Sequence, residues 1–531
     1  MDNLSELDHR YVWHPFTQMR DWLKRDPIVI VEGSGAVLRD SKGREYLDAN
    51  SSIWTNLHGH NHPKINAAIQ RQLKKIAHSS ALGFANEPAS VLAAKLVEVA
   101  NQTCRGPKVG ARPSSGAAIS EPPKASELSQ TAGTTDVAAP GDGRTPGNAG
   151  GMPLAKVFFS DDGSTAVEVA LKLAYEHARR TGQSKSPRFL SLEGGYHGDT
   201  VGAVSLGHIN LFHKAYGGLL FKTDKVMSPY CYRCKFNRAR PERADARDYR
   251  KCNWECVSLV EKQFSTQKKK GKPYSAFVVE PLMQGAAGMI PQPPGWLRQV
   301  VQIARSHRAQ LIADEVMTGF ARTGCRAGVP PATPGVSPAL VAPTPPPLFA
   351  CHHEGVKPDF LAVAKGLTGG YLPMAATLTT QAVFDAFLGD YSEFKTFFHG
   401  HSFTGNQLGS AAALASLELL QSTTSIAARQ RLEQALRKEL KTLWPLPNVG
   451  DIRQVGLIAG VELVKNWRTR APFALRERAG IRVCDAMARR GVLTRPIGNV
   501  IVLMPPYCTA NAQLRQMVQA LREAIIETMG N

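Results

Sequence analysis

The feature of this sequence that most limits its possible folds is a series of short apolar runs separated by amphipathic helical patterns. Five such runs are mostly apolar on both faces, as buried strands are, and they cover residues 155–160, 188–192, 276–280, 309–314 and 359–364. Between the first two runs, residues 164–180 place Val167 and Leu171 on one face of a helix, and Gly182 follows as a stop signal. This alternation predicts an α/β fold with a mainly parallel sheet covered on both faces.

Two segments interrupt the pattern and resemble insertions into loops. In residues 105–153, 33 of 49 residues are Gly, Pro, Ala, Ser or Thr and none is aromatic, so we predict a disordered insertion. Residues 326–347 contain eight prolines, which favour an extended, polyproline-like conformation over a helix or a central strand. The rest of the 531-residue chain is long enough for two or more folded units.

Composition and charge narrow the possible partners. The 64 Lys and Arg residues against 44 Asp and Glu give a net charge of +20, which fits either a nucleic-acid partner or a basic solvated surface. The basic residues are dispersed and no nucleic-acid motif is present, so we expect no nucleic-acid partner. The longest uncharged stretch, residues 327–352, contains prolines that would break a membrane-spanning helix. Residues 1–11 are acidic and lack an apolar run, which is unlike a signal or transit peptide and predicts a cytoplasmic protein.

The residues after each strand are the candidates for chemistry, because ligands bind beyond the carboxyl ends of parallel strands. After the first run, Gly163 and Ser164 open a helix whose backbone N–H groups and hydroxyl suit a phosphate, although helix capping would also explain them. After the second run, Tyr196 follows two glycines and could stack on a flat ring. The alternative for Tyr196 is a buried side chain in a Gly-rich turn.

Two charged residues end later strands. Asp314 ends a wholly apolar strand, and a buried carboxylate needs a cationic partner. Lys365 directly follows residues 359–364, where desolvation would lower the pKa of its amine and make it a nucleophile, unless the amine is solvated. A phosphate cradle, a stacking ring, a buried acid and a buried amine together fit pyridoxal phosphate (PLP). Lys365 would hold the cofactor as a Schiff base, and Asp314 would keep the pyridine nitrogen protonated.

These residues and three further blocks resemble the class III aminotransferases of the fold-type I PLP family. The blocks are residues 11–19, 51–63 and 495–507, and the likeness extends from about residue 11 to residue 529 without the two insertions. It implies a large PLP-binding domain, residues 51–390, and a smaller α+β domain formed by residues 1–50 and 391–531. It also implies a homodimer with a shared site, to which one subunit contributes Gly400 and Ser402 near the phosphate and substrate of the other.

The same blocks are similar to the branch of this family that converts 8-amino-7-oxononanoate to 7,8-diaminononanoate in biotin biosynthesis. The resemblance implies that Lys365 moves the proton and that Arg495 clamps the substrate carboxylate. It further implies a substrate pocket lined by Trp54, Asp199, Arg322 and Tyr507.

The sequence is compatible with two amino donors. Better-known members of the branch use S-adenosylmethionine and carry Trp and Tyr where this chain has Ile53 and Phe16. Losing one aromatic face removes a possible cation–π contact with a sulfonium, worth about 0.5–2 kcal/mol. We expect S-adenosylmethionine as the donor, and L-lysine, which a second group of these enzymes uses, is the alternative.

Two other classes of protein are compatible with Lys365 and Asp314. An aminomutase of the glutamate-semialdehyde type would keep both residues but would not need the block at residues 495–507. A non-catalytic, ligand-binding relative would not need an intact Lys365. The sequence therefore favours a transferase, with another class III omega-aminotransferase as the remaining alternative.

Four of the nine cysteines lie close together in the sequence. They follow a C-x2-C and C-x3-C pattern with 17 residues between the pairs, at Cys231, Cys234, Cys252 and Cys256. This spacing approximates that of a structural zinc site, and a metal would order the highly charged segment between the pairs. An iron–sulfur cluster and a surface loop with reduced thiols are the alternatives.

Overall fold

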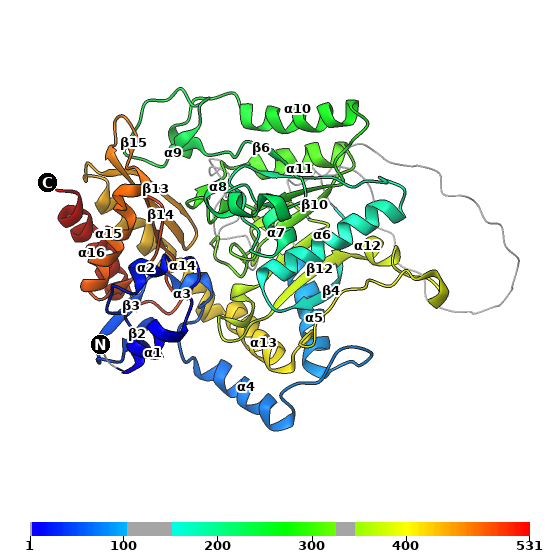
Figure 1. Cartoon of the computed structure of the whole chain (residues 1–531), viewed down its shortest axis with the longest axis horizontal. Coiled ribbons are helices and arrows are strands. Elements are labelled where there is room, and N and C mark those ends of the chain that lie inside the picture. The colour runs from blue at the N-terminus through cyan, green and yellow to red at the C-terminus, as the bar shows by residue number, and fades with distance from the viewer. Residues whose placement is uncertain (1–2, 103–150, 325–345, 531) are drawn as a thin grey trace, which may run out of the picture.

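The computed structural model describes residues 3–102, 151–324 and 346–530 (Figure 1). The predicted insertions at residues 105–153 and 326–347 therefore lie outside the described residues, except for their last few positions. Within the described ranges, every helix is too short or too polar to cross a membrane.

The chain is organised around a seven-stranded sheet. Its strands occur in the order β4 (Leu154–Ser160), β12 (Ala375–Thr380), β11 (Phe360–Val363), β10 (Gln310–Asp314), β7 (Ala276–Val279), β5 (Phe189–Leu192) and β6 (Asp224–Val226). Only β12 runs antiparallel to its neighbours, so the predicted mainly parallel α/β sheet is confirmed. All five predicted strands are present within about one residue of their expected ends. The sequence analysis did not identify β6 and β12.

Alternate residues of the central strands face two different layers of helices. Val278 and Ile312 pack in a cluster with residues of α6, whereas their neighbours Val279 and Leu311 belong to the larger core cluster on the other face. Helices α6 (Gly163–Arg180), α7 (Val201–Leu206) and α12 (Gln381–Asp385) cover the first face. The larger cluster includes residues of α5 (Glu87–Ala100), α10 (Glu255–Lys269), α11 (Trp296–Ser306) and α13 (Gln407–Gln421).

The two ends of the chain lie beside each other (Figure 1). Strand β3 pairs in parallel with β16, although the two come from opposite ends of the sequence. This small sheet has the order β1 (Ile30–Ser34), β2 (Val37–Asp40), β3 (Glu45–Asp48), β16 (Val492–Leu493). The N-terminal part also contains α1 (Asn3–Tyr11), α2 (Met19–Trp22), α3 (Ser51–Trp54) and α4 (Pro63–Lys75). The domain limits at residues 50 and 390 remain a prediction.

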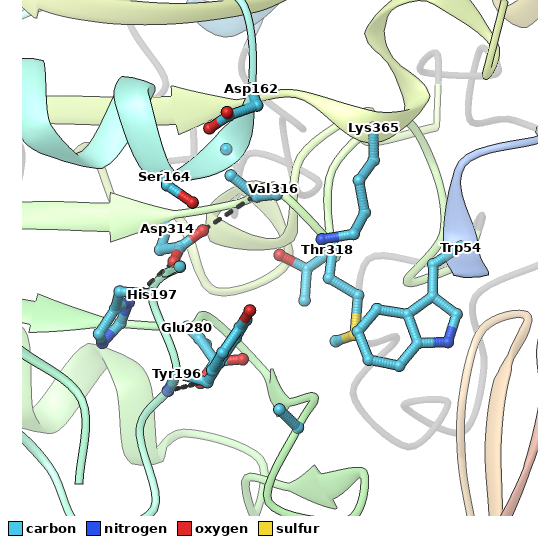
Figure 2. Close-up of a pocket in the computed structure, with 14 residues that line it drawn as sticks. Trp54, Asp162, Ser164, Tyr196, His197, Glu280, Asp314, Val316, Thr318 and Lys365 are labelled. Carbon is cyan, nitrogen blue, oxygen red and sulfur yellow. Dashed lines mark hydrogen bonds and ion pairs between the residues drawn. The ribbon is translucent and has the colours of Figure 1, made fainter. Parts of the chain in front are cut away.

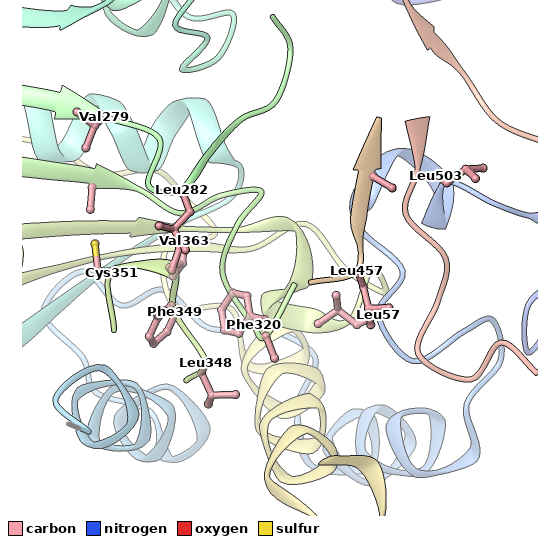
Figure 3. Packing of buried hydrophobic residues seen from close by; sticks show 14 of the residues in the cluster. Leu57, Val279, Leu282, Phe320, Leu348, Phe349, Cys351, Val363, Leu457 and Leu503 are labelled. Atoms are coloured by element: carbon pink, nitrogen blue, oxygen red, sulfur yellow. The ribbon is translucent and has the colours of Figure 1, made fainter. Parts of the chain in front are cut away.

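The C-terminal part forms a second antiparallel sheet with its own helices. Its strands are β13 (Val449–Val455), β14 (Ile458–Asn466), β15 (Ala471–Pro472), β17 (Pro496–Ile497) and β18 (Val500–Leu503). Its helices are α14 (Thr423–Leu440), α15 (Ala479–Arg489) and α16 (Asn511–Met529). The larger core cluster extends from Val363 of the central sheet to Leu457 and Leu503 beside and within the second sheet (Figure 3). A shared apolar core therefore fixes the second sheet against the first.

Candidate active site

One cavity lies at the carboxyl ends of the central strands. It has a volume of about 110 Å³. Six predicted site residues line it, namely Trp54, Gly163, Ser164, Tyr196, Asp314 and Lys365 (Figure 2). The other lining residues are Asp162, His197, Gly198, Glu280, Ala286, Val316, Met317 and Thr318. The residues predicted from strand ends therefore meet in one cavity although up to about 200 positions separate them in the sequence, and Trp54, predicted from the family resemblance, lies beside them.

Lys365 follows β11 and projects into this cavity (Figure 2). Its backbone has a φ of 39°, which is uncommon for a residue with a side chain and indicates that the surrounding structure enforces the conformation. Burial lowers the pKa of the Lys365 amine, although Asp314 and Glu280 oppose the shift. The amine also lies 5.4 Å from the centre of the Trp54 ring. A larger fraction of this amine is therefore neutral and nucleophilic than in an ordinary lysine.

Asp314 has a cationic partner, as a buried carboxylate requires. Its Oδ2 lies 2.8 Å from Nδ1 of His197, and its Oδ1 accepts from the backbone N–H of Val316 at 3.1 Å. Burial opposes a charged imidazole, but the contact with Asp314 raises the pKa of His197 overall. The contact with His197 and the backbone N–H of Val316 orient the Asp314 carboxylate at the end of β10, where it lines the cavity and can face a ring nitrogen.

The N-terminus of α6 has the close packing expected of a ligand cradle. A Cβ at Gly163 would lie 2.6 Å from Cγ1 of Val316, and one at Gly198 would lie 2.3 Å from Oγ of Ser164. Ser164 Oγ accepts from the backbone N–H of Asp199 at 3.1 Å, so its own proton can point to a ligand. Asp162 caps the helix by accepting from Thr165 N at 2.9 Å, which leaves the N–H groups of Gly163 and Ser164 for an anion.

Tyr196 is held from two sides. Its hydroxyl donates to Oδ2 of Asp199 at 2.7 Å. Its ring stacks on His213 with an angle of 12° between the planes and 6.3 Å between the centres. Burial, together with Asp199, raises the pKa of Tyr196, so the phenol stays protonated and the ring presents a flat, neutral face.

Two polar atoms in the cavity wall are buried without a hydrogen-bond partner in the described part of the chain. They are Oγ1 of Thr318, whose residue is 0 % exposed, and Nε1 of Trp54. Unsatisfied buried polar groups are costly, and they persist where a ligand completes them. Together with the anion cradle, the flat ring, the charged Asp314 and the buried amine, these atoms make the cavity fit PLP.

Three of the eight lining residues that were not predicted as site residues are polar side chains in or directly after a predicted strand or motif. Glu280 is the last residue of the predicted strand 276–280, His197 follows Tyr196, and Thr318 follows the strand that ends at Asp314. Applying the strand-end rule to every polar residue at these positions would have found them. The amino-acid composition did not point to any of these three residues.

The remaining predicted substrate residues do not line this cavity within one chain. Arg322 is buried with its guanidinium donating to the carbonyls of Pro505 at 2.9 Å and Asn56 at 3.4 Å. Tyr507 lies under that guanidinium, 4.9 Å away, and donates to Phe320 O. Asp199 does not line the cavity, but it accepts the hydrogen bond of the Tyr196 hydroxyl, and Tyr196 does line it. The others, Gly400, Ser402 and Arg495, are exposed and lie outside the lining.

The four cysteines do not form a metal site in the structure. Cys231, Cys234, Cys252 and Cys256 are free thiols, and no three His, Cys, Asp or Glu side chains are grouped to hold a metal within the described ranges. Burial raises the pKa of Cys231 to about 12 and that of Cys256 to about 11, and the neighbouring thiols of the group add to both shifts. The predicted structural zinc is therefore not supported.

Comparison with known proteins gives a consistent family. The model of the aminotransferase class-III family matches residues 20–117, 144–341 and 347–525. The chain is 41 % identical to adenosylmethionine-8-amino-7-oxononanoate aminotransferase of Geobacter sulfurreducens, over 99 % of this chain and 98 % of that protein.

Solved structures agree with this result. The crystal structure of adenosylmethionine-8-amino-7-oxononanoate aminotransferase from Methanocaldococcus jannaschii matches with a TM-score of 0.78 and 35 % identity over 99 % of both chains. A PLP-bound amine transaminase from an uncultivated Pseudomonas species matches with a TM-score of 0.76 and 28 % identity, over 97 % of this chain and 98 % of that one. The chain belongs to the class III aminotransferases and is a PLP-dependent enzyme.

Proposed function

We propose that this enzyme transfers an amino group from S-adenosylmethionine to the keto carbon of 8-amino-7-oxononanoate, giving 7,8-diaminononanoate for biotin biosynthesis in the cytoplasm. The observation that carries the proposal is the position of Lys365, which faces Asp314 and Tyr196 in a chain similar over its full length to relatives named for this substrate pair. An intact Lys365 and Asp314 support catalysis over a purely binding role.

Each lining residue has a defined task in this proposal. When bound, PLP supplies the ring that accepts the electrons of the bond broken at the substrate carbon. Nζ of Lys365 would hold the cofactor and would carry the proton to and from that carbon. Asp314, oriented by His197, would pair with the ring nitrogen. Tyr196 would stack on the ring, and Gly163 and Ser164 would bind the phosphate through N–H and hydroxyl donors.

The substrate end of the site is proposed from the family resemblance. Arg495 is exposed and presents a planar pair of donors that matches a carboxylate. Trp54 forms the wall nearest to Lys365, and Arg322 and Tyr507 form a buried support behind it. The carboxylate of 8-amino-7-oxononanoate would bind Arg495 while its keto carbon reaches Lys365.

We propose a homodimer in which Gly400 and Ser402 complete the partner's site. These residues lie in an exposed apolar surface, since Leu82 is 87 % and Phe84 74 % exposed. This surface is formed by residues 78–84 and residues 400–403. The two segments are in contact, because the rings of His78 and Phe403 lie 4.8 Å apart. A second copy of the chain would cover these side chains. Light scattering should give twice the chain mass, and Ser402→Ala should weaken PLP binding about tenfold through loss of one phosphate hydrogen bond.

The donor is tested by single-turnover absorbance. The PLP enzyme is mixed with S-adenosylmethionine or with L-lysine, and 8-amino-7-oxononanoate is added after the cofactor absorbance has changed. Conversion by S-adenosylmethionine supports the proposal and shows that Ile53, which is exposed, is tolerated in place of an aromatic residue. If only lysine changes the cofactor absorbance, lysine is the donor. If neither amine changes it, the enzyme is an omega-aminotransferase that acts on another substrate.

A further inference from the structure

Glu280 is a buried carboxylate in the active-site wall for which the proposed reaction has no task. It follows β7, is 6 % exposed and lines the cavity beside Tyr196 (Figure 2). No Lys, Arg or His side chain lies within ion-pair distance of it in the described part of the chain. A buried carboxylate without a cation is costly, so its retention needs an explanation.

The hydrogen bonds of Glu280 connect two separate segments of the wall. Its Oε1 accepts from the backbone N–H of Tyr196 at 3.2 Å, and its Oε2 accepts from the backbone N–H of Gly285 at 2.8 Å. Tyr196 is the stacking residue in the loop after β5. Gly285 follows β8 (Met283–Gln284) in the hairpin with β9 (Ile290–Pro291), and the next residue, Ala286, lines the cavity.

The position of Gly285 leaves no room for a side chain. A Cβ there would lie 2.6 Å from Sδ of Met317, which is itself a lining residue. The absence of a side chain therefore lets the hairpin backbone lie directly against the cavity wall. One carboxylate thus contacts the backbone of this hairpin and the backbone of Tyr196 at the same time.

Charged groups from three other strand ends face Glu280. They are His197 after β5, Asp314 at the end of β10, and Lys365 after β11. Burial raises the pKa of Glu280 to about 7, with Asp314 adding to the shift and His197 opposing it. In turn, Glu280 favours the protonated form of Lys365.

We propose that Glu280 is a positioning residue, which fixes Tyr196 and the hairpin at Gly285 in the wall of the cofactor site and whose carboxylate acts on the Lys365 amine in the same cavity. The proposal rests on the assignment of Tyr196 and Lys365 to that site, but it does not depend on which amine donor or acceptor the enzyme uses.

The test compares Glu280→Gln with a matched control, Glu354→Gln. Glu354 is 7 % exposed and also accepts from two backbone N–H groups, those of Gly295 at 2.7 Å and Arg298 at 2.9 Å, but it is not part of the cavity wall. Hydrogen–deuterium exchange is measured by mass spectrometry on the full-length protein with and without PLP. We expect exchange in Glu280→Gln to rise about tenfold in the peptides containing Tyr196 and Gly285, as loss of a charge-assisted hydrogen bond predicts.

The control should instead raise exchange only around Gly295 and Arg298. An unchanged rate at either Tyr196 or Gly285, or a rise spread evenly over the sheet in both variants, would overturn the proposal. If Glu280→Gln does not fold, Glu280→Asp keeps the charge but is one methylene shorter, and it must show the same two local rises.

A second measurement reports on Lys365. The visible absorbance of the bound cofactor is titrated with pH, and removing the charge of Glu280 should move the midpoint to lower pH, whereas Glu354→Gln should leave it in place. A midpoint that does not move in Glu280→Gln contradicts the electrostatic part of the proposal. Transfer to 8-amino-7-oxononanoate is measured separately, so that a wrong substrate assignment is distinguished from a wrong role for Glu280.

Discussion

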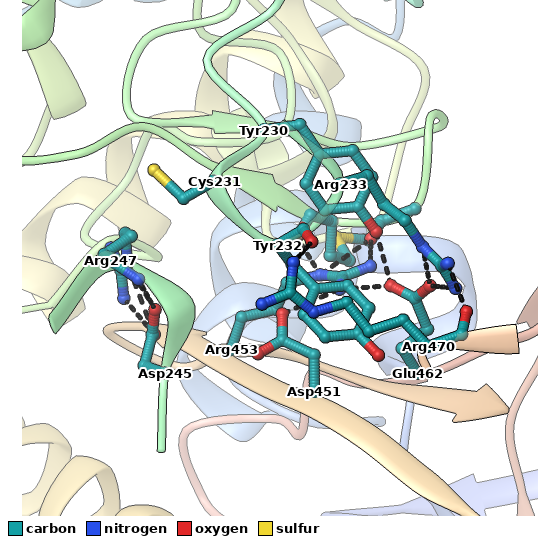
Figure 4. A network of polar contacts seen from close by, with 12 residues as sticks. Tyr230, Cys231, Tyr232, Arg233, Asp245, Arg247, Asp451, Arg453, Glu462 and Arg470 are labelled. Carbon is teal, nitrogen blue, oxygen red and sulfur yellow. Dashed lines mark hydrogen bonds and ion pairs between the residues drawn. The ribbon is translucent and has the colours of Figure 1, made fainter. Parts of the chain in front are cut away.

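Two buried polar clusters in the described part of the chain differ in how their charges are paired. The cluster behind the active site joins the segment after β6 to the C-terminal sheet, and in it Arg453 lies 3.0 Å from Asp451 and 2.6 Å from Glu462 (Figure 4). Arg233 also pairs with Glu462 at 2.6 Å. Burial alone would raise the pKa of Glu462, but the two guanidinium groups hold it below its ordinary value.

In the active-site cluster, the buried carboxylate of Glu280 is not paired with a guanidinium group in this way. Glu280 receives only backbone N–H groups, and Thr318 and Trp54 keep polar atoms without partners among the described residues. Arg453, in contrast, also donates to the carbonyls of Gly288 and Met289 in the hairpin that leads to the cavity. The first cluster also keeps buried atoms without partners among the described residues, Oδ1 of Asp451 and the hydroxyl of Tyr232. The two clusters therefore differ in charge pairing and position: the first pairs its ions between two segments as a structural joint, whereas only the second lines the cavity.

The largest effect should come from Lys365→Ala. Loss of the amine that moves the proton should lower transamination about 10⁴-fold, at the upper end for a positioned proton-transfer group. The variant should unfold at a urea concentration no lower than the wild type, because it removes a buried, partly charged amine. Steady-state transamination and urea unfolding are measured side by side, and a variant that still transaminates would refute the assigned role.

Arg453→Gln tests the structural cluster. Removing one partner of a buried ion pair should lower the free energy of unfolding by about 3–5 kcal/mol, because Asp451 and Glu462 would remain buried with less compensation. Arg437→Gln is the control, since Arg437 is exposed and its pair with Glu433 at 3.4 Å should contribute less than about 1 kcal/mol. Equal urea midpoints for the two variants would contradict the distinction between the clusters.

Glu315 offers a third case, a buried carboxylate outside both clusters that accepts from the backbone N–H groups of Ala350 and Cys351 and from the Cys351 thiol. Burial raises the pKa of Glu315 from about 4.5 to about 7. As pH rises, Glu315 stays protonated to a higher pH in the folded state than in the unfolded state. Its contribution to the free energy of unfolding is therefore fully present below pH 4.5. It is lost as pH rises through 7, and the total loss is about 3 kcal/mol.

Thermal unfolding between about pH 5 and pH 8 checks this sign. The unfolding temperature of Glu315→Gln should fall less with rising pH than that of the wild type, because the amide does not titrate. Parallel curves for the two proteins would show that Glu315 keeps an ordinary pKa.

The smallest expected effect is that of Gly163→Ala on the cofactor cradle. The added Cβ would press on Val316, and overpacking of this kind costs about 1–3 kcal/mol, which predicts PLP binding weaker by about tenfold. Gly217→Ala is the control, since its Cβ would have no neighbour within 4 Å. Fluorescence titration of the apo-protein with PLP measures both, and equal affinities would show that the cradle tolerates a shift of Val316.

Five of the seven strands of the central sheet, and the residues at their ends, could be predicted from the sequence alone. Five buried strands and α6 were predicted from apolar periodicity, because each is read from neighbouring residues. Gly163, Ser164, Tyr196, Asp314 and Lys365 were then placed at one edge, because parallel strands bring their carboxyl ends together.

Only the tertiary structure decided which polar groups pair across distant segments. The contact of His197 with Asp314, the double acceptor role of Glu280 and the joint at Arg453 each depend on side chains that meet through folding, at separations where periodicity carries no information. The cysteines show the reverse case, since a spacing suited to zinc gave no group of side chains arranged to hold a metal among the described residues. Sequence spacing determines which residues share one face of a strand or helix. The distance between thiols or carboxylates on different elements is set by how those elements pack.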